Sequence, residues 1–135
     1  MIHQMQVRIY YQGTDAGGIV YHSNYLDYAE RARSEMLLEM GYSNHVMVEK
    51  GIGFVLRHVD IDYRKPARLD ELLTVETVVT EMKNASLEME QTVLRGEDVL
   101  VVMRLQLAAI NPQTLRPTRM PEELKTLFLK YSKEK

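Results

Sequence analysis

Cysteine is absent from the 135 residues, and this absence excludes a disulfide framework, a thiolate metal site and a cysteine nucleophile. Long apolar runs are also missing, since none approaches the roughly 18 residues that would span a bilayer. The first six residues lack both the basic cluster and the apolar stretch of a secretion signal. We therefore expect a cytoplasmic protein without a membrane span.

Neither sign of charge dominates. The chain has 17 Lys and Arg against 19 Asp and Glu, a formal net charge of −2, which argues against a general nucleic-acid-binding surface. Composition is 45% hydrophobic and 27% charged, which is typical of globular proteins. The length fits a domain that buries about two-thirds of its unfolded surface. No linker or internal repeat interrupts it, so we expect residues 1–135 to form one domain.

The spacing of apolar residues divides the chain into helices and strands. Near-helical spacing predicts a long helix whose first turn Ser23 or Asn24 can cap and which Gly41 can end. Alternating apolar residues predict strands. The predicted strands span 6–11, 54–66, 72–82, 86–95 and 99–109, and the predicted helices span 23–40, 43–50 and 121–131.

The order of these elements, one strand, a long helix and then four strands, predicts an α+β fold. Adjacent strands joined by short turns pair antiparallel, and Gly96-Glu97-Asp98 forms such a turn. One face of a five-stranded antiparallel sheet needs cover, and one long helix can cover it, so we predict a curved sheet around that helix. Apolar residues on both faces of strand 99–109, such as Leu100 and Val102 opposite Val101, further predict that a second subunit buries the other face.

The common catalytic motifs are missing. The chain contains no G-x-S-x-G nucleophile turn, no phosphate-binding G-x-x-x-x-G-K-[ST] loop and no dinucleotide-binding glycine pattern. Its four histidines form no i,i+4 pair and have no cysteine partners. We therefore expect neither a structural nor a catalytic metal.

Residues 10–25 join the first strand to the long helix and contain the most informative polar side chains. Asp15 precedes Gly17 and Gly18, which let a substrate approach the backbone, and a helix N-terminus follows, whose free N–H groups can hold a developing oxyanion. Asp15 could activate water or attack a carbonyl itself, and His22 could orient the substrate or share the proton. The spacing also fits a structural interpretation, in which Asp15 caps a turn and His22 is a surface histidine.

A resemblance to hotdog-fold thioesterases lies in the motif Tyr11-x-x-Thr14-Asp15-Ala16-Gly17-Gly18-Ile19-Val20-Tyr21-His22-x-x-Tyr25, followed by Tyr28-x-Glu30-Arg31-Ala32-Arg33. Within these enzymes the chain is similar to the 4-hydroxybenzoyl-CoA thioesterase family, and most closely to its Tol–Pal-associated acyl-CoA thioesterase (YbgC) branch. A second matching motif is Asp62-Tyr63-x-x-Pro66-Ala67-Arg68-Leu69-Asp70-Glu71. The resemblance thus extends from Gln6 to Phe128.

This resemblance implies both a fold and an assembly. The fold is a five-stranded antiparallel sheet wrapped around one long central helix. Subunits associate through sheet pairing into homodimers and often into homotetramers. The active sites lie at the dimer interface, where the Asp-containing loop of one subunit meets residues of the other.

The resemblance also implies a reaction, the hydrolysis of acyl-CoA, and of acyl groups on acyl carrier protein, to a free acid and a thiol without a metal or organic cofactor. By position, Asp15 matches the catalytic carboxylate, and His22 falls where the branch has His. Gly17 and Gly18 lie in the turn whose backbone faces the thioester. Tyr25 matches a branch position that we assign to substrate binding, with a core aromatic as the alternative.

Basic residues lie along and just after the strand predicted at 54–66. The phosphates of CoA need positive charge near the mouth of a cleft, and Arg57, Arg64, Lys65 and Arg68 supply it. We take Arg64 and Lys65 as candidate CoA contacts; the alternative is an exposed charged face without a ligand.

Two other functions stay open. An acyl-thioester hydratase or dehydratase would carry a His/acid arrangement on the long helix, but residues 24–40 contain no histidine. A non-catalytic binding module in an envelope or lipid-synthesis assembly would tolerate replacement of Asp15. The acyl chain length is not readable, because residues of two subunits would shape the pocket.

Overall fold

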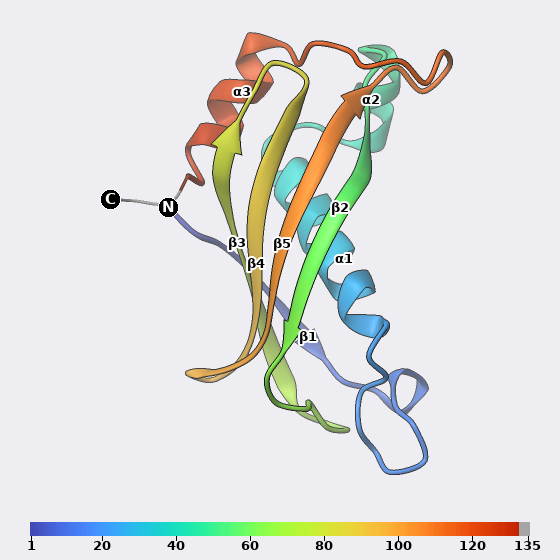
Figure 1. Ribbon diagram of the computed structural model, residues 1–135, viewed down its shortest axis with the longest axis vertical. Coiled ribbons are helices and arrows are strands. Elements are labelled where there is room, and N and C mark those ends of the chain that lie inside the picture. The colour runs from blue at the N-terminus through green and yellow to red at the C-terminus, as the bar shows by residue number, and fades with distance from the viewer. Residues whose placement is uncertain (133–135) are drawn as a thin grey trace.

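The computed structural model describes residues 1–132, which form strands, α-helices and one short 3₁₀ helix (Figure 1). The strands are β1 (His3–Arg8), β2 (Gly53–Tyr63), β3 (Leu72–Met82), β4 (Ser86–Arg95) and β5 (Asp98–Ile110). The α-helices are α1 (Asn24–Glu39), α2 (Asn44–Glu49) and α3 (Glu122–Leu129), and η1 (Tyr11–Gly13) is the 3₁₀ helix. The α+β class and the order of the elements are as the sequence predicts.

The strands form one antiparallel sheet in the order β1-β3-β4-β5-β2. The hairpin between β4 and β5 turns at Gly96-Glu97, where Gly96 has a φ of 61°. The prediction that adjacent strands pair holds for β3–β4 and β4–β5 but is wrong for β2 and β3. Residues 64–71 connect these two strands across the end of the sheet, and β2 pairs with β5 instead. This crossover segment comes to lie beside the loop that contains Asp15.

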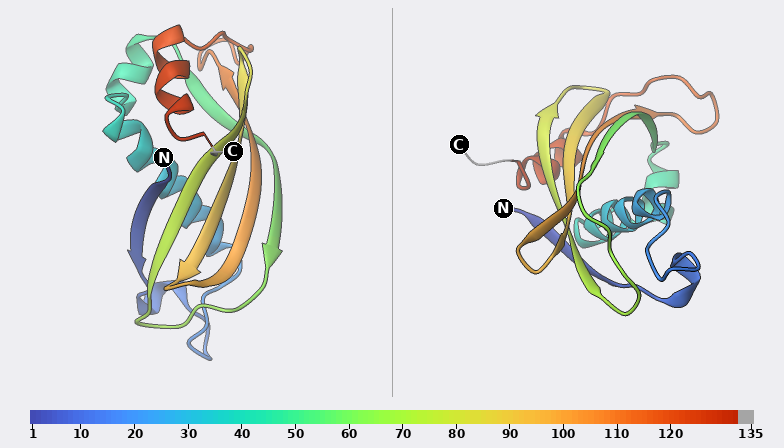
Figure 2. Two further views of the ribbon diagram at one scale, coloured as in Figure 1. Left: turned by 90° about the vertical axis from the view of Figure 1, so that its left-hand side faces the viewer. Right: turned by 60° about the horizontal axis from the view of Figure 1, so that its bottom comes forward.

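Helix α1 lies against the concave face of the curved sheet (Figure 2). Ala29, Ala32 and Met36 on its inner side are fully buried, and the two alanines allow a close approach to the strands. Helix α1 ends at Glu39 with Met40 as its C-cap, and Gly41, the glycine predicted to end the helix, follows with a φ of 85°. The amides of Gly41 and Tyr42 donate to the carbonyls of Leu38 and Leu37, the pattern of a Schellman motif.

A buried polar network fixes the middle of α1 to the sheet. Gln91 of β4 is fully buried, and its Nε2 donates to the Ala29 carbonyl at 2.9 Å and to Thr77 Oγ1 at 3.0 Å. Its Oε1 accepts from Nη1 of Arg33 at 2.9 Å. Desolvation lowers the pKa of Arg33. These bonds satisfy both ends of the Gln91 amide, so they define where α1 crosses the sheet.

Three local predictions are wrong at the element ends. The first strand begins at His3 and ends at Arg8, and Tyr11 lies in η1 with its side chain exposed. Neither Ser23 nor Asn24 caps α1 with its side chain; Asn24 Nδ2 donates instead to the Gly13 carbonyl at 2.8 Å. Strand β2 stops at Tyr63, because the amides of the next two residues both donate to the Leu100 carbonyl, at 2.8 and 3.1 Å.

The two-sided apolar pattern of β5 has an explanation within one chain. Leu100 and Val102 are 0% and 7% exposed without a second subunit. Farther along the same strand, Arg104 is exposed and Gln106 is half-buried. The pattern therefore does not require a partner, and the dimer stays a prediction. Within residues 1–132, no helix has the length and apolar character needed to cross a membrane.

Candidate active site

The loop before α1 holds the Asp15 carboxylate in a defined position. Oδ1 accepts from the amides of Gly17 at 2.8 Å and Ile19 at 3.2 Å. The backbone closes the same turn, since the Asp15 amide donates to the Ile19 carbonyl at 2.9 Å. Asp15 is exposed, and within the described chain Oδ2 has no hydrogen-bond partner. One oxygen is thus anchored while the other is open to a substrate or a water molecule.

The two glycines of this loop have different local requirements. Gly18 has a φ of 76°, and its amide donates to the Asp15 carbonyl at 3.0 Å. Gly17 is not in the left-handed region, but a Cβ there would lie 3.4 Å from Asp15 Oδ1. The expectation of positive φ therefore applies to Gly18, whereas Gly17 keeps space beside the carboxylate.

His22 lies at the surface between two tyrosines. The ring centroids of His22 and Tyr21 are 4.7 Å apart, and Tyr63 of β2 approaches His22 edge-on at 6.4 Å. The Tyr63 hydroxyl donates to the His22 backbone carbonyl at 3.0 Å. In the described part of the chain, no hydrogen bond joins the His22 and Asp15 side chains. The aromatic contacts therefore position the imidazole.

The backbone before α1 offers free amides, but fewer than the sequence suggests. The Tyr21 amide already donates to the Gly13 carbonyl at 3.1 Å, and the Asn24 amide donates to the Tyr21 carbonyl at 3.0 Å. Between them, the amides of His22 and Ser23 donate to no other described residue. These two neighbouring amides, together with the Tyr25 amide, which also has no acceptor among the described residues, are candidates for polarising a carbonyl.

The two sequence motifs meet in space. The Val20 amide donates to the Ala67 carbonyl and the Leu69 amide donates to the Gly18 carbonyl, both at 2.9 Å. Tyr25 of α1 is 3% exposed, and its hydroxyl accepts from the Ala67 amide at 3.1 Å. Burial raises the pKa of Tyr25. The hydroxyl thus supports the crossover segment, while a contact between Tyr25 and substrate stays a prediction.

The candidate CoA-binding side chains already have carboxylate partners. Nε of Arg64 donates to Asp62 Oδ2 at 2.9 Å, and Nζ of Lys65 donates to Asp98 Oδ1 at 3.3 Å. Arg57 and Arg68 are exposed and form no ion pair with any residue of the described chain. Arg68 lies in the crossover segment opposite Ile19 of the Asp15 loop. The backbone of Arg68 is therefore paired directly with that loop.

A groove of about 530 Å³ runs between α1, α2 and the edge strand β2. Its lining is mostly apolar and includes Leu26, Leu37, Met47, Ile52, Phe54 and Leu107. Glu30 and Arg33 of α1 contribute charge to it. No cluster of three or more His, Asp or Glu side chains suited to a metal ion occurs within residues 1–132.

The model of the thioesterase-like superfamily matches residues 7–128. The chain belongs to this superfamily. The sequence is 39% identical to the acyl-CoA thioesterase YbgC of Haemophilus influenzae over 123 residues, which cover 90% of each chain. It is 35% identical to the acyl-CoA thioester hydrolase YbgC of Escherichia coli, covering 90% of this chain and 92% of that one.

A solved structure shows the same fold. The probable thioesterase from Bartonella henselae superposes with a TM-score of 0.83 at 38% identity, covering 90% of this chain and all of that one. The resemblance to hotdog thioesterases is therefore confirmed, as is the five-stranded antiparallel hotdog sheet. One residue beside the site was not among the predicted site residues. Tyr63 contacts the His22 ring and donates to the His22 carbonyl, and its place in the second motif was the signal that could have identified it.

Proposed function

We propose that this protein is an acyl-CoA thioesterase that hydrolyses the thioester to a free acid and the CoA thiol. The main supporting observation is the Asp15 carboxylate, anchored at Oδ1 by two loop amides and open at Oδ2. Membership of the thioesterase-like superfamily and the similarity to YbgC enzymes favour this reaction over a binding role. The absence of histidine from α1 argues against an acyl-thioester dehydratase.

In one route Asp15 acts as a general base. Oδ2 takes a proton from water as the water oxygen bonds to the thioester carbon, and the carbonyl oxygen becomes an oxyanion. The free amides of His22 and Ser23 stabilise that charge. The carbon–sulfur bond then breaks, and the departing thiolate receives a proton. Products are the acid and the thiol.

In the second route Asp15 is the nucleophile. Its carboxylate oxygen bonds to the thioester carbon, the thiolate leaves, and water hydrolyses the resulting mixed anhydride to restore Asp15. The exposed Oδ2 suits either route. His22 orients the substrate or the water in both, and the tyrosines on either side of it hold the ring for this purpose.

The groove beside β2 is suited to hold the acyl group. Its apolar lining begins at Leu26, in the first turn of α1, and continues toward α2. We infer that α1 is the central helix of the hotdog fold and that residues 1–135 act as one domain. We also infer that a second subunit pairs along β2, a sheet edge where Val55 and Leu56 are each 40% exposed, and completes the site in a homodimer or homotetramer.

The CoA phosphates need cations at the mouth of this site. Arg64 and Lys65 are our proposed contacts, and each would exchange its present carboxylate partner for a phosphate. Gly17 and Gly18 place backbone rather than side chains beside the thioester. We propose that Tyr25 of α1 also lines the substrate site, next to Ala67, whose amide donates to the Tyr25 hydroxyl.

A substrate panel tests this function. Acyl-CoAs from acetyl to palmitoyl, aromatic acyl-CoAs and acyl-acyl carrier protein are incubated with the full chain, and thiol release is followed. We expect thiol release from at least one acyl-CoA without added metal. Absence of hydrolysis across the whole panel would favour the non-catalytic binding module.

A further inference from the structure

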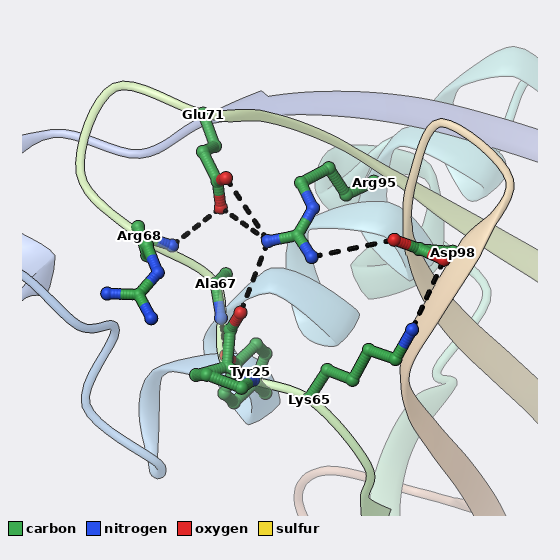
Figure 3. Close-up of polar contacts among 8 residues, drawn as sticks. Tyr25, Lys65, Ala67, Arg68, Glu71, Arg95 and Asp98 are labelled. Carbon is green, nitrogen blue, oxygen red and sulfur yellow. Dashed lines mark hydrogen bonds and ion pairs between the residues drawn. The ribbon is translucent and has the colours of Figure 1, made fainter.

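Four charged side chains meet at one end of the sheet, two from the crossover segment 64–71 and two from the ends of β4 and β5 (Figure 3). We call Lys65, Glu71, Arg95 and Asp98 the strand-end cluster. Nη1 of Arg95 donates to both carboxylate oxygens of Glu71, at 3.0 and 3.1 Å. Nη2 of Arg95 lies 3.6 Å from Asp98 Oδ2, and Nζ of Lys65 lies 3.3 Å from Asp98 Oδ1. The cluster thus ties the crossover segment 64–71 to the β4–β5 hairpin.

The central pair of this cluster is partly shielded from water. The side chains of Glu71 and Arg95 are 25% and 31% exposed. Shielded, hydrogen-bonded ion pairs hold their geometry better than exposed ones, which are weak and mobile. The hydrogen bond to Glu71 also raises the pKa of Arg95. The pair is therefore a fixed element of this end of the sheet.

Both members of the pair also bind the backbone of the crossover segment. Glu71 Oε1 accepts from the Arg68 amide at 2.7 Å, and Nη1 of Arg95 donates to the Pro66 carbonyl at 3.3 Å. These contacts lie on the two sides of Ala67, which is fully buried. In Figure 3 the Arg68 side chain points away from the cluster, so only its amide takes part.

The crossover segment in turn holds the Asp15 loop. The Ala67 carbonyl accepts from Val20, and the Leu69 amide donates to Gly18, both at 2.9 Å. Gly18 and Val20 are the neighbours of Ile19, whose amide donates to Asp15 Oδ1 at 3.2 Å. A continuous series of hydrogen bonds and backbone therefore joins Arg95 to the Asp15 carboxylate.

We propose that Glu71 and Arg95 are positioning residues for thioester hydrolysis, because their ion pair fixes the crossover segment and, through it, the loop that aims Asp15. This inference rests on the proposed function. Neither side chain contacts Asp15, so both act through backbone that they hold in place. Small displacements of a reacting group reduce turnover strongly, whereas they change substrate binding less.

The test uses variants of the pair and a matched control. Glu71→Gln keeps an acceptor for the Arg68 amide but removes the charge, and Arg95→Met removes all the contacts. Arg95→Lys retains the charge without the planar set of donors. The control is Glu90→Gln on β4. The Glu90 side chain is 26% exposed, and its Oε2 lies 3.6 Å from Nε of Arg104. Neither residue belongs to the Asp15 loop or to the crossover segment.

Kinetics separate positioning from general destabilisation. With the best acyl-CoA at a temperature where all variants are folded, we expect Glu71→Gln and Arg95→Met to lower kcat about 10-fold with KM within about 2-fold. The kcat of Arg95→Lys should lie between the kcat of these two variants and that of the wild type. The kcat of Glu90→Gln should stay within about 2-fold of the wild-type value. In an Asp15→Asn background the same changes should cost no further activity. An unchanged kcat, or an equal loss in that background, would overturn the proposal.

Amide exchange gives a second readout that does not depend on activity. The Gly17 and Ile19 amides bind Asp15 Oδ1, so we expect their hydrogen exchange to quicken in Glu71→Gln and Arg95→Met but not in Glu90→Gln. Unchanged exchange in the first two variants would overturn the proposal. If the wild type hydrolyses no acyl-CoA, the proposed function fails, and the exchange result alone then decides whether the pair positions the loop.

Discussion

The neighbouring glycines of the Asp15 loop provide a matched pair for separating backbone strain from crowding. Gly18 has a φ of 76°, and a Cβ added there would meet no atom within 4 Å. Relaxing this φ would disturb the hydrogen bonds of its amide to Asp15 and of its carbonyl to Leu69. Gly18→Ala should therefore retain the left-handed conformation, which costs an L-residue about 1–2 kcal/mol.

Gly17→Ala is the control for this change. Its backbone is outside the left-handed region, and the added Cβ would lie 3.4 Å from Asp15 Oδ1, a tolerable contact. Both substitutions reduce the entropy of the unfolded chain equally, by about 0.4–1 kcal/mol, so this effect cancels in their difference. We expect Gly18→Ala to unfold roughly 4–8 °C below Gly17→Ala in a thermal scan. Equal midpoints would refute the strain argument.

Three other changes have expected outcomes. Gly17→Val should fold but lose turnover, because its extra methyl groups crowd Asp15 Oδ1; steady-state kinetics equal to the wild type would show that this space is not needed. Gln91→Leu should lower the free energy of unfolding in urea by about 2 kcal/mol, because the Ala29 carbonyl and Arg33 lose a buried partner; a loss below about 0.5 kcal/mol would contradict this. The hydrogen bond and charge of Lys65, together with Arg95, lower the pKa of Asp98. The stabilisation from the Lys65–Asp98 contact is therefore complete at pH values above the ordinary pKa of Asp, and it is lost as the pH falls through the lowered pKa. An NMR titration should show the Asp98 pKa rising in Lys65→Met, and an unchanged value would rule the contact out.

Strands with regular alternation were predictable from the sequence. The ranges 72–82 and 86–95 coincide with β3 and β4, because inward apolar residues alternate with polar ones along both. The first strand was harder to place, since its buried end is polar. His3 is 3% exposed, and its Nε2 lies 2.9 Å from Glu39 Oε2. Such a partner on α1 is not visible in a period-two pattern.

Only the part of the site that is formed by residues close together in sequence was predictable. The Asp15 turn is formed by its own neighbours, so its position before the helix follows from the motif. The Glu71–Arg95 pair instead depends on the sheet order and on the crossover of residues 64–71, which pattern reasoning did not give. A single Arg at the end of a strand resembles any exposed charge.

The kinetics of Asp15→Asn test the central claim most directly. The amide keeps the shape of the side chain and an oxygen to accept from Gly17 and Ile19, but it loses the charge and most of the basicity. With the acyl-CoA that the wild type hydrolyses best, we expect normal folding, retained substrate binding and a kcat at least about 100-fold lower. A folded Asp15→Asn variant that hydrolyses this substrate at a near wild-type rate would contradict the assignment of Asp15 as base or nucleophile.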